Sequence, residues 1–116
     1  MERLLFVLHD PPYGTERVYN ALRWASQMAA GGDEIKVFFF GDSVIAAAAG
    51  QKVPNGYYNT GKQAANLVAA GAALGCCGTC MAASGLPDDR LRPGAHRSSM
   101  SELAQWTTWA HKVINV

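Results

Sequence analysis

The sequence has little charge, and neither sign dominates. Charged residues make up only 16% of the 116 residues, and ten Lys and Arg against nine Asp and Glu leave a net charge of +1. A typical domain carries about 25% charged residues, and a nucleic-acid-binding protein usually has a basic excess or a basic run. Apolar residues reach 49%, which excludes a disordered chain, since disorder combines low hydrophobicity with high charge. We therefore expect a folded protein with no nucleic-acid partner.

Long apolar runs are also absent. Apolar runs such as residues 37–40 and 44–49 are far shorter than the roughly 20 residues that a membrane span requires. The N-terminus runs directly into an apolar segment without a small-residue cleavage pattern, so we expect no signal peptide. No phosphate-binding loop of the G-x-x-x-x-G-K-S/T type is present. We expect a soluble, cytoplasmic protein that forms a single domain over residues 1–116 and does not bind a membrane.

The low charge bears on assembly as well. A small domain buries only about 60–70% of the surface that its unfolded chain exposes. With 49% apolar residues, a monomer of this size would leave much apolar surface in water, although an alanine-rich composition would account for part of it. We favour a homo-oligomer that buries the excess.

Apolar periodicity predicts alternating strands and helices. Continuous apolar runs, which are typical of strands covered on both faces, predict strands at residues 3–8, 35–40, 72–77 and 113–116, with a weaker one at 91–97. Helical spacing predicts helices at 18–29 with Thr15 as N-cap, at 60–70, and from a capping box at Ser99 onward. Residues 42–49 and 78–84 suit short helices or turns, and residues 50–59 form the longest loop. The order predicts an open, mainly parallel α/β sheet of about five strands with helices on both faces.

In such sheets, ligands and chemistry gather at the carboxyl ends of the strands. This rule selects His9 with Asp10 after the first strand, the cysteines after the third, and His96 with Arg97 near the fourth. His9, His96 and Arg97 are therefore candidate pocket residues. Elsewhere, His111 is placed to bond the last carbonyls of its helix.

The three cysteines lie within five positions, at Cys76, Cys77 and Cys80. An odd, local cluster is unlike a secreted disulfide framework. The Cys77–Cys80 spacing falls where a strand passes into a helix, and backbone N–H groups there stabilise a thiolate. A thiolate is the nucleophile both in disulfide exchange and in persulfide formation.

Several readings of these cysteines stay open. They could be buried structural thiols, which we expect above all for Cys76. A zinc site would need His9 and His96 to complete the four ligands. A redox pair and a sulfur carrier both require a reactive Cys77 or Cys80, and the spacing does not separate them.

Four aromatic residues have two interpretations each. Trp106 and Trp109, three apart on one predicted helix, belong to the core or to a subunit interface. Tyr57 and Tyr58 in the long loop either cover the cysteines or contact a neighbouring subunit.

The element order and two segments resemble the DsrE/DsrF-like family, in particular its small single-domain members of the YchN type. These segments are CGTCMAASG at residues 77–85 and GAHRSSMSEL at 94–103, the latter followed by Trp106 and Trp109. The resemblance implies an open α/β sheet and a homo-oligomer, commonly a trimer or a hexamer of stacked trimers. It also implies a sulfur-relay role, in which one cysteine carries sulfur as a persulfide and hands it to a partner protein.

Matching the motifs places Cys80 at the relay cysteine, with Cys77 as a resolving or auxiliary thiol. Many relatives have an acidic residue and an arginine soon after this cysteine, where this chain has Ala82, Ala83 and Ser84; Arg97 could take the place of that arginine.

We therefore predict a small sulfurtransferase or sulfur carrier with donor and acceptor proteins as partners, and we expect no cofactor and no metal. The alternatives are a thiol–disulfide redox protein that uses Cys77 and Cys80, and a non-catalytic oligomeric binding module.

Overall fold

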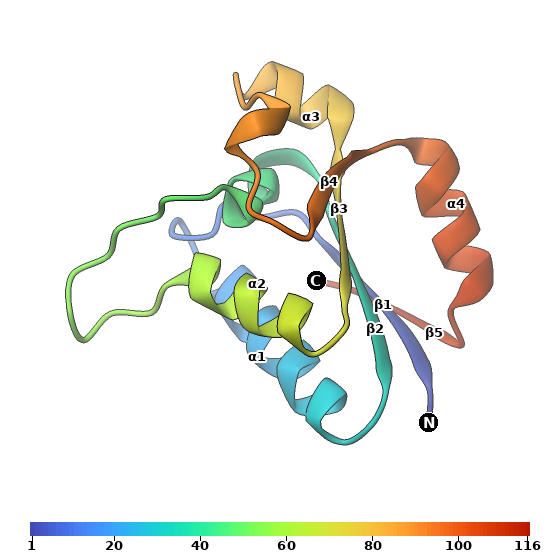
Figure 1. The fold of residues 1–116 in the computed structure, drawn as a ribbon. Helices are drawn as coiled ribbons and strands as arrows, with labels where there is room; N and C mark the ends of the chain where they lie inside the picture. The colour runs from blue at the N-terminus through green and yellow to red at the C-terminus, as the bar shows by residue number, and fades with distance from the viewer.

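The computed structural model describes all 116 residues as a five-stranded sheet with helices on both faces (Figure 1). The strand order is β4-β3-β2-β1-β5, and every neighbouring pair is parallel. The strands are β1 (Arg3–Leu8), β2 (Glu34–Phe39), β3 (Ala73–Cys77), β4 (Ala95–Ser98) and β5 (Lys112–Asn115). The predicted open parallel α/β sheet is confirmed.

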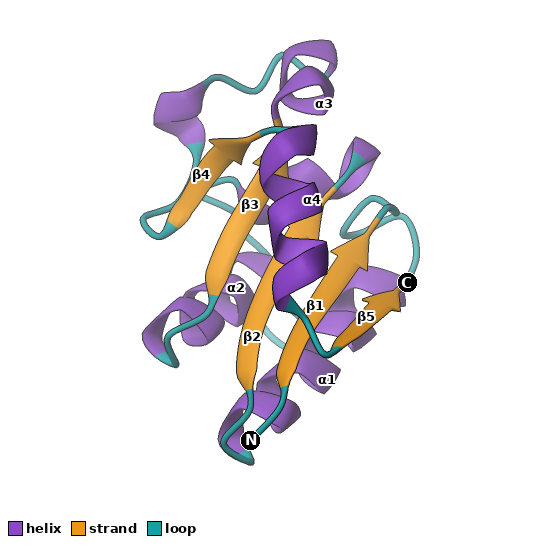
Figure 2. Ribbon diagram, turned by 90° about the vertical axis from the view of Figure 1, so that its right-hand side faces the viewer, coloured by secondary structure: helices purple, strands orange, loops and turns teal.

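Three longer helices cover the two faces. On one face lie α1 (Arg17–Ala30) and α2 (Thr60–Ala69), whereas α4 (Met100–Trp109) crosses the other face alone (Figure 2). The chain moves outward from β1 to β4, then returns through α4 to β5 on the far side of β1. This reversal places helices on both faces, as right-handed crossovers require. None of the helices has the length and apolar character needed to span a bilayer.

The two faces of the sheet have separate cores. Leu4, Phe6 and Leu8 of β1 belong to the larger core on the α1 and α2 side. Leu5 and Val7, which point the other way, form a smaller core with Phe38 and with Trp106 of α4. Because β1 is buried on both faces, its sequence is continuously apolar rather than alternating.

Short helices gather beyond the carboxyl ends of the strands. They are η1 (Gly41–Ala47), α3 (Gly78–Ala83) and η2 (Asp88–Arg90), and Figure 1 shows α3 directly above β3. The Ala-rich segment predicted as a helix or turn is thus a 3-10 helix, and the turn predicted after the third strand is one short α-helix. The fourth strand is shorter than the predicted 91–97 and runs only from Ala95 to Ser98.

The helix starts match the prediction at one position and differ at another. Ser99 caps α4, and its Oγ accepts the Glu102 N–H at 3.2 Å, as the capping box predicts. Thr15, in contrast, does not cap α1. That helix begins at Arg17, and Glu16 at its N-cap makes no side-chain bond. The Thr15 Oγ1 nevertheless accepts the Arg17 N–H at 3.3 Å and donates to Asp10 at 2.9 Å, so it links the helix start to the preceding turn from one position before the N-cap.

Candidate functional site

Strand β3 carries the cysteines to the carboxyl edge of the sheet. All three are free thiols, but their surroundings differ. Cys76 is completely buried in the larger core, and this burial, with a smaller contribution from Cys77, raises its pKa to about 12. A buried thiol of this kind is not a nucleophile at neutral pH. The expectation that Cys76 is a structural thiol agrees with its environment.

Cys77 and Cys80 form a pair at the start of α3. Cys77 ends β3 and caps α3, and its Sγ accepts the backbone N–H of Cys80 at 3.3 Å. The Cys77 side chain also raises the pKa of the Cys80 thiol, as expected for two neighbouring sulfur atoms. Both are only partly buried, so they can react with each other and with external reagents.

The local backbone explains why the helix starts here. Gly78 is the first residue of α3, and a Cβ at this position would lie 3.0 Å from the Ser98 carbonyl oxygen and 3.0 Å from Arg97 Nη1. A residue without a side chain therefore lets the turn after β3 pass close to β4. This turn places the Cys77 and Cys80 side chains next to each other.

A backbone N–H from a neighbouring strand end also reaches the pair. Burial raises the pKa of Cys80, and the hydrogen bond and charge of Cys77 raise it further. The N–H groups of Gly41 and of Cys80 itself act in the opposite direction without cancelling the rise. The expectation that the strand–helix junction stabilises a thiolate and so lowers its pKa is therefore wrong for Cys80, because burial outweighs the N–H donors. Gly41 follows β2 with φ +53°, a conformation that glycine adopts without strain. Sequence reasoning missed Gly41, although a glycine directly after an apolar strand is the signal that could have found it.

Arg97 lies close to the cysteines but does not bond them. Its Nη1 donates to the Gly78 carbonyl oxygen at 3.0 Å, and its Nε donates to Asp88 Oδ1 at 2.7 Å. The guanidinium thus ties β4 to α3 and η2. That Arg97 takes the place of an arginine after Cys80 stays a prediction, since its guanidinium bonds Gly78 and Asp88 rather than a thiol.

The two candidate histidines are not brought together with the cysteines. His96 lies within β4, and its Nε2 bonds Glu102 Oε1 of α4. His9 is exposed after β1, with its Nε2 2.5 Å from Asn115 Oδ1 and its ring stacked on Phe40. Nowhere do three or more His, Cys, Asp or Glu side chains form a metal-binding group. The zinc alternative completed by His9 and His96 is therefore wrong.

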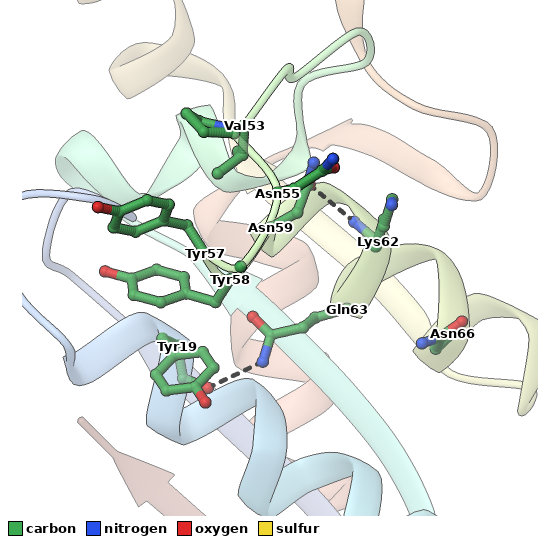
Figure 3. A pocket seen from close by; sticks show the side chains of 11 residues that line it. Tyr19, Val53, Asn55, Tyr57, Tyr58, Asn59, Lys62, Gln63 and Asn66 are labelled. Atoms are coloured by element: carbon green, nitrogen blue, oxygen red, sulfur yellow. Dashed lines mark hydrogen bonds between the residues drawn. The ribbon is translucent and has the colours of Figure 1, made fainter.

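The long loop forms a cavity of about 300 Å³ that lies apart from the cysteines (Figure 3). Tyr58 stacks on Tyr19 of α1, with ring centroids 4.2 Å apart, and on Tyr13 at 5.7 Å. The residues that line the cavity come from α1, α2 and residues 53–59, and none is a cysteine. Tyr57 and Tyr58 therefore do not cover the cysteines, which removes one of their two interpretations.

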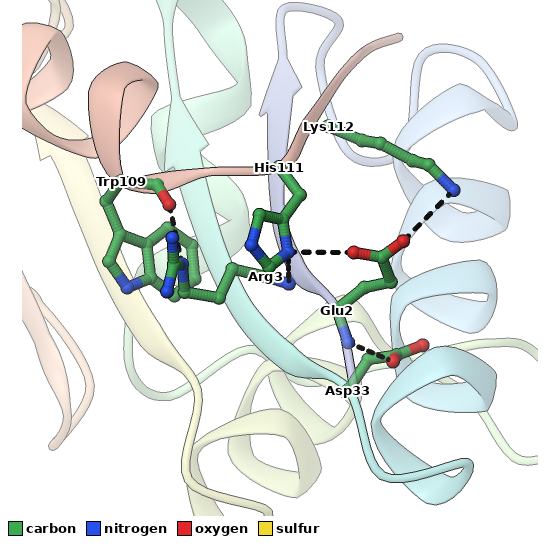
Figure 4. Close-up of polar contacts among 6 residues, drawn as sticks. All are labelled: Glu2, Arg3, Asp33, Trp109, His111 and Lys112. Atoms are coloured by element: carbon green, nitrogen blue, oxygen red, sulfur yellow. Dashed lines mark hydrogen bonds and ion pairs between the residues drawn. The ribbon is translucent and has the colours of Figure 1, made fainter.

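His111 has a different role from the one predicted. Its Nδ1 lies 2.7 Å from Glu2 Oε2 and 3.1 Å from the Arg3 backbone nitrogen (Figure 4). Arg3 in turn donates from Nε to the Trp109 carbonyl oxygen at 2.7 Å. A carbonyl at the end of α4 is thus bonded by Arg3 rather than by His111, and the contacts fasten β5 beside β1.

Comparison with known proteins agrees with this architecture. YchN from Escherichia coli strain K12 is 32% identical over 116 residues, which cover 98% of both chains. An uncharacterised protein from Methanopyrus kandleri is 34% identical over 111 residues, covering 93% of this chain and 88% of its own length. The crystal structure of the Escherichia coli YchN protein matches with a TM-score of 0.93 and 31% identity over the whole of both chains. A protein of unknown function from Methanobacterium thermoautotrophicum shares the fold, with a TM-score of 0.78 at 17% identity.

The family model described as the DsrE/DsrF-like family matches residues 2–116. The resemblance seen in the cysteine segment and in the tail is therefore confirmed over nearly the whole chain. The chain belongs to the DsrE/DsrF-like family.

Proposed function

We propose that this protein is a sulfur carrier in which Cys80 accepts a sulfane sulfur as a persulfide and passes it to a partner protein. The observation that carries the proposal is the position of Cys80, a partly exposed thiol to which the Gly41 backbone N–H is directed from the next strand. Membership of the family supports the same role. The proposed partners are a donor protein and an acceptor protein in the cytoplasm.

The transfer consists of two displacements at sulfur. The Cys80 thiolate attacks the outer sulfur of a donor persulfide, the donor S–S bond breaks, and the donor leaves as a thiolate. An acceptor thiolate later attacks the outer sulfur on Cys80 and releases Cys80 as a thiolate. Sulfur bears negative charge at each stage, and the N–H groups of Gly41 and Cys80 are donors that can stabilise it. Because the pKa of Cys80 is raised, the resting side chain is a thiol that must lose its proton before the first displacement.

Cys77 is placed to act as the auxiliary thiol. Its Sγ accepts the Cys80 backbone N–H at 3.3 Å, which keeps the two residues side by side. Attack of the Cys77 thiolate on the inner sulfur of the persulfide would expel hydrosulfide and leave a Cys77–Cys80 disulfide. This step would discharge the carrier, so the acceptor must react before Cys77 does.

Intact-mass spectrometry after incubation with a low-molecular-weight persulfide tests the proposal. We expect the protein to gain one sulfur, the Cys80→Ser variant to gain none, and the Cys76→Ala control to behave as the parent because Cys76 is buried. Equal sulfur gain by Cys80→Ser would refute the assignment.

Gly41→Ala tests the observation on which the assignment rests. An alanine at φ +53° is strained by about 1–2 kcal/mol, and relief of that strain would turn the Gly41 N–H away from Cys80. We expect slower sulfur gain in this variant. Gly50→Ala is the matched control, since Gly50 also has a positive φ of 75° and a Cβ there would meet no atom within 4 Å. Equal rates in the two variants would show that the Gly41 N–H does not assist.

The two neighbouring, partly exposed thiols also favour a second candidate, a thiol–disulfide redox protein. The same mass measurement separates the two functions. Loss of two hydrogens in the parent, absent from both Cys77→Ser and Cys80→Ser, identifies the redox pair. No change of mass in any variant favours a non-catalytic binding module.

We further propose that the chain assembles as a homo-oligomer, a trimer or a hexamer of stacked trimers. Large apolar side chains that lie exposed on the single chain support this assembly: Tyr57 is 73% exposed, Met100 67%, Trp24 50% and Val113 46%. Burial of such side chains between copies is the usual stabilising contribution in homo-oligomers.

A further inference from the structure

The paired thiols at the start of α3 have a donor set that suits a particular class of metal ion. Cys77 and Cys80 are one helical turn apart and both partly exposed, and Cys77 Sγ accepts the Cys80 backbone N–H at 3.3 Å. Cys76, although adjacent in sequence, is fully buried in the core on the α1 and α2 side. The site therefore offers two sulfur donors and not three.

Two sulfur donors are too few for zinc, the metal that protein thiolates bind more commonly. Zinc takes four protein ligands in structural sites and at least three in catalytic sites. No three or more His, Cys, Asp or Glu side chains are arranged so that they could hold a metal ion, so neither arrangement can form within one chain. Soft thiolate ligands select copper(I), and this monovalent ion is satisfied by two of them.

We propose that Cys77 and Cys80 bind one copper(I) ion per chain through their two sulfur atoms. Binding is a ligand exchange without electron transfer: each thiol releases its proton to solvent, and two thiolates with one Cu⁺ form a complex of net charge −1. The two S–Cu bonds replace the two S–H bonds.

The surroundings of the pair suit an anionic complex. The Cys80 N–H is already directed at Cys77 Sγ, at 3.3 Å, and the Gly41 N–H is directed at Cys80. Arg97 adds a guanidinium fixed 3.0 Å from the Gly78 carbonyl oxygen, although Asp88 balances part of its charge. No carboxylate is bonded to either thiol, so the negative charge of the complex meets donors rather than like charge.

The copper site does not depend on sulfur transfer, although it uses the same thiols. A protein that carries sulfur without binding copper, or binds copper without carrying sulfur, would separate the two proposals. If both hold, the copper-loaded protein gains no sulfur, because neither thiolate remains free to attack a donor.

Anaerobic competition with the chelator bathocuproine disulfonate, which releases copper(I) with a loss of colour, measures the affinity. We expect the reduced full-length protein and Cys76→Ala to take up one copper per chain with equal affinity. Cys77→Ser and Cys80→Ser should each bind at least about 100-fold more weakly, since even changes outside the ligand shell weaken metal sites 10–100-fold. Zinc(II), tested with a chromophoric zinc chelator, should show no comparable binding.

Three outcomes would overturn the proposal. They are undiminished binding by either serine variant, a dependence on Cys76, and a ratio of one copper to two chains, which would mean that copies share the ion. Circular dichroism of the same proteins checks that each variant is folded. Cys77→Ser should fold because serine is a good N-cap and its hydroxyl can accept the Cys80 N–H.

Alkylation gives a second readout that does not rely on affinity. One equivalent of copper(I) should protect Cys77 and Cys80 of the parent protein from iodoacetamide. Alkylation of either residue at the metal-free rate would contradict the assignment.

Discussion

At the scale of the residue, environment separates three thiols that the sequence places within five positions. Cys76 points into the core and Cys80 lies partly exposed at the start of α3. Strand alternation directs Cys76 and Cys77 to opposite faces, whereas the one-turn spacing and the cap bring Cys77 back to Cys80. Spacing alone could predict the pair, and it could not predict the Gly41 N–H, because that contact depends on where β2 ends beside β3.

The buried thiol predicts how stability depends on alkaline pH. Burial raises the pKa of Cys76 from 9.0 to about 12, so the folded state favours the protonated form more than the unfolded chain does. This contribution is complete below pH 9 and is lost as the pH rises toward 12. At about 1.4 kcal/mol per pKa unit, it amounts to at most about 4 kcal/mol.

Urea unfolding of the parent and of Cys76→Ala measures how the free energy of unfolding depends on pH. The range from about pH 8 to pH 11 includes the ordinary pKa of a thiol. Other groups titrate in the same range, so the difference between the two proteins is the relevant quantity. We expect the parent to lose more stability than the variant. Parallel curves would show that ionisation of Cys76 is not linked to folding.

At the scale of the element, β4 and the start of α4 are joined by a polar cluster. Glu102 in the first turn of α4 accepts the Ser98 hydroxyl at 2.6 Å and bonds His96. The His96 ring lies edge-on against Trp106, with centroids 5.9 Å apart. The cluster thus fastens an edge strand to the only helix on this face of the sheet.

The cluster also shows where sequence reasoning stops. The capping box predicts the Ser99 bond and the helix start correctly, because both depend on residues three apart. It predicts that Glu102 turns back to the cap, yet the carboxylate bonds Ser98 and His96 instead. The sequence predicts His96 as a pocket residue at the carboxyl edge of the sheet. Because β4 is a short edge strand with no apolar pattern, neither the bounds of β4 nor the face to which His96 points could be predicted from the sequence.

Glu102 predicts how stability changes in acid. Partial burial acts to raise the pKa of Glu102, but the bonds from Ser98 and His96 and the charges of His96 and Lys36 outweigh it and leave the pKa below 4.5. A lowered folded-state pKa stabilises the protein above pH 4.5, and this contribution is lost as the pH falls through the folded-state value.

We expect Glu102→Gln to lower stability at pH 7 by about 1 kcal/mol, the scale of a partly exposed charged hydrogen bond. Its loss of stability below pH 4.5 should be shallower than that of the parent, because the group that takes up the proton has been removed. Thermal unfolding between pH 3 and pH 7 measures both effects. Glu16→Gln is the control, since Glu16 is exposed and caps α1 without a side-chain bond; equal acid sensitivity of the two variants would contradict a special role for Glu102.

At the scale of the whole molecule, the single chain leaves specific apolar side chains without a partner. The sheet with α1 and α2 on one face and α4 on the other accounts for the buried strands and places Trp106 in the smaller core, one of the two interpretations that the sequence leaves open. Its accessible area of 6155 Å² is about what a monomer of 12.4 kDa normally exposes. The identity of the exposed side chains, and not the total exposed area, therefore favours assembly.

Tyr57 is the most exposed aromatic residue that the structure offers for an interface, at 73%. Its neighbour Tyr58 is stacked on Tyr19, which holds the loop with Tyr57 turned outward. Since the tyrosines do not cover the cysteines, contact with another copy is the remaining interpretation.

We expect the parent to sediment at a multiple of 12.4 kDa and Tyr57→Asp to shift toward the monomer, because a buried carboxylate without a partner is strongly unfavourable at an interface. Asn55→Asp adds the same charge to the same loop at an exposed position and should leave the mass unchanged; a parent that sediments as a monomer, or a Tyr57→Asp variant that keeps the parent's mass, would remove this loop from the assembly.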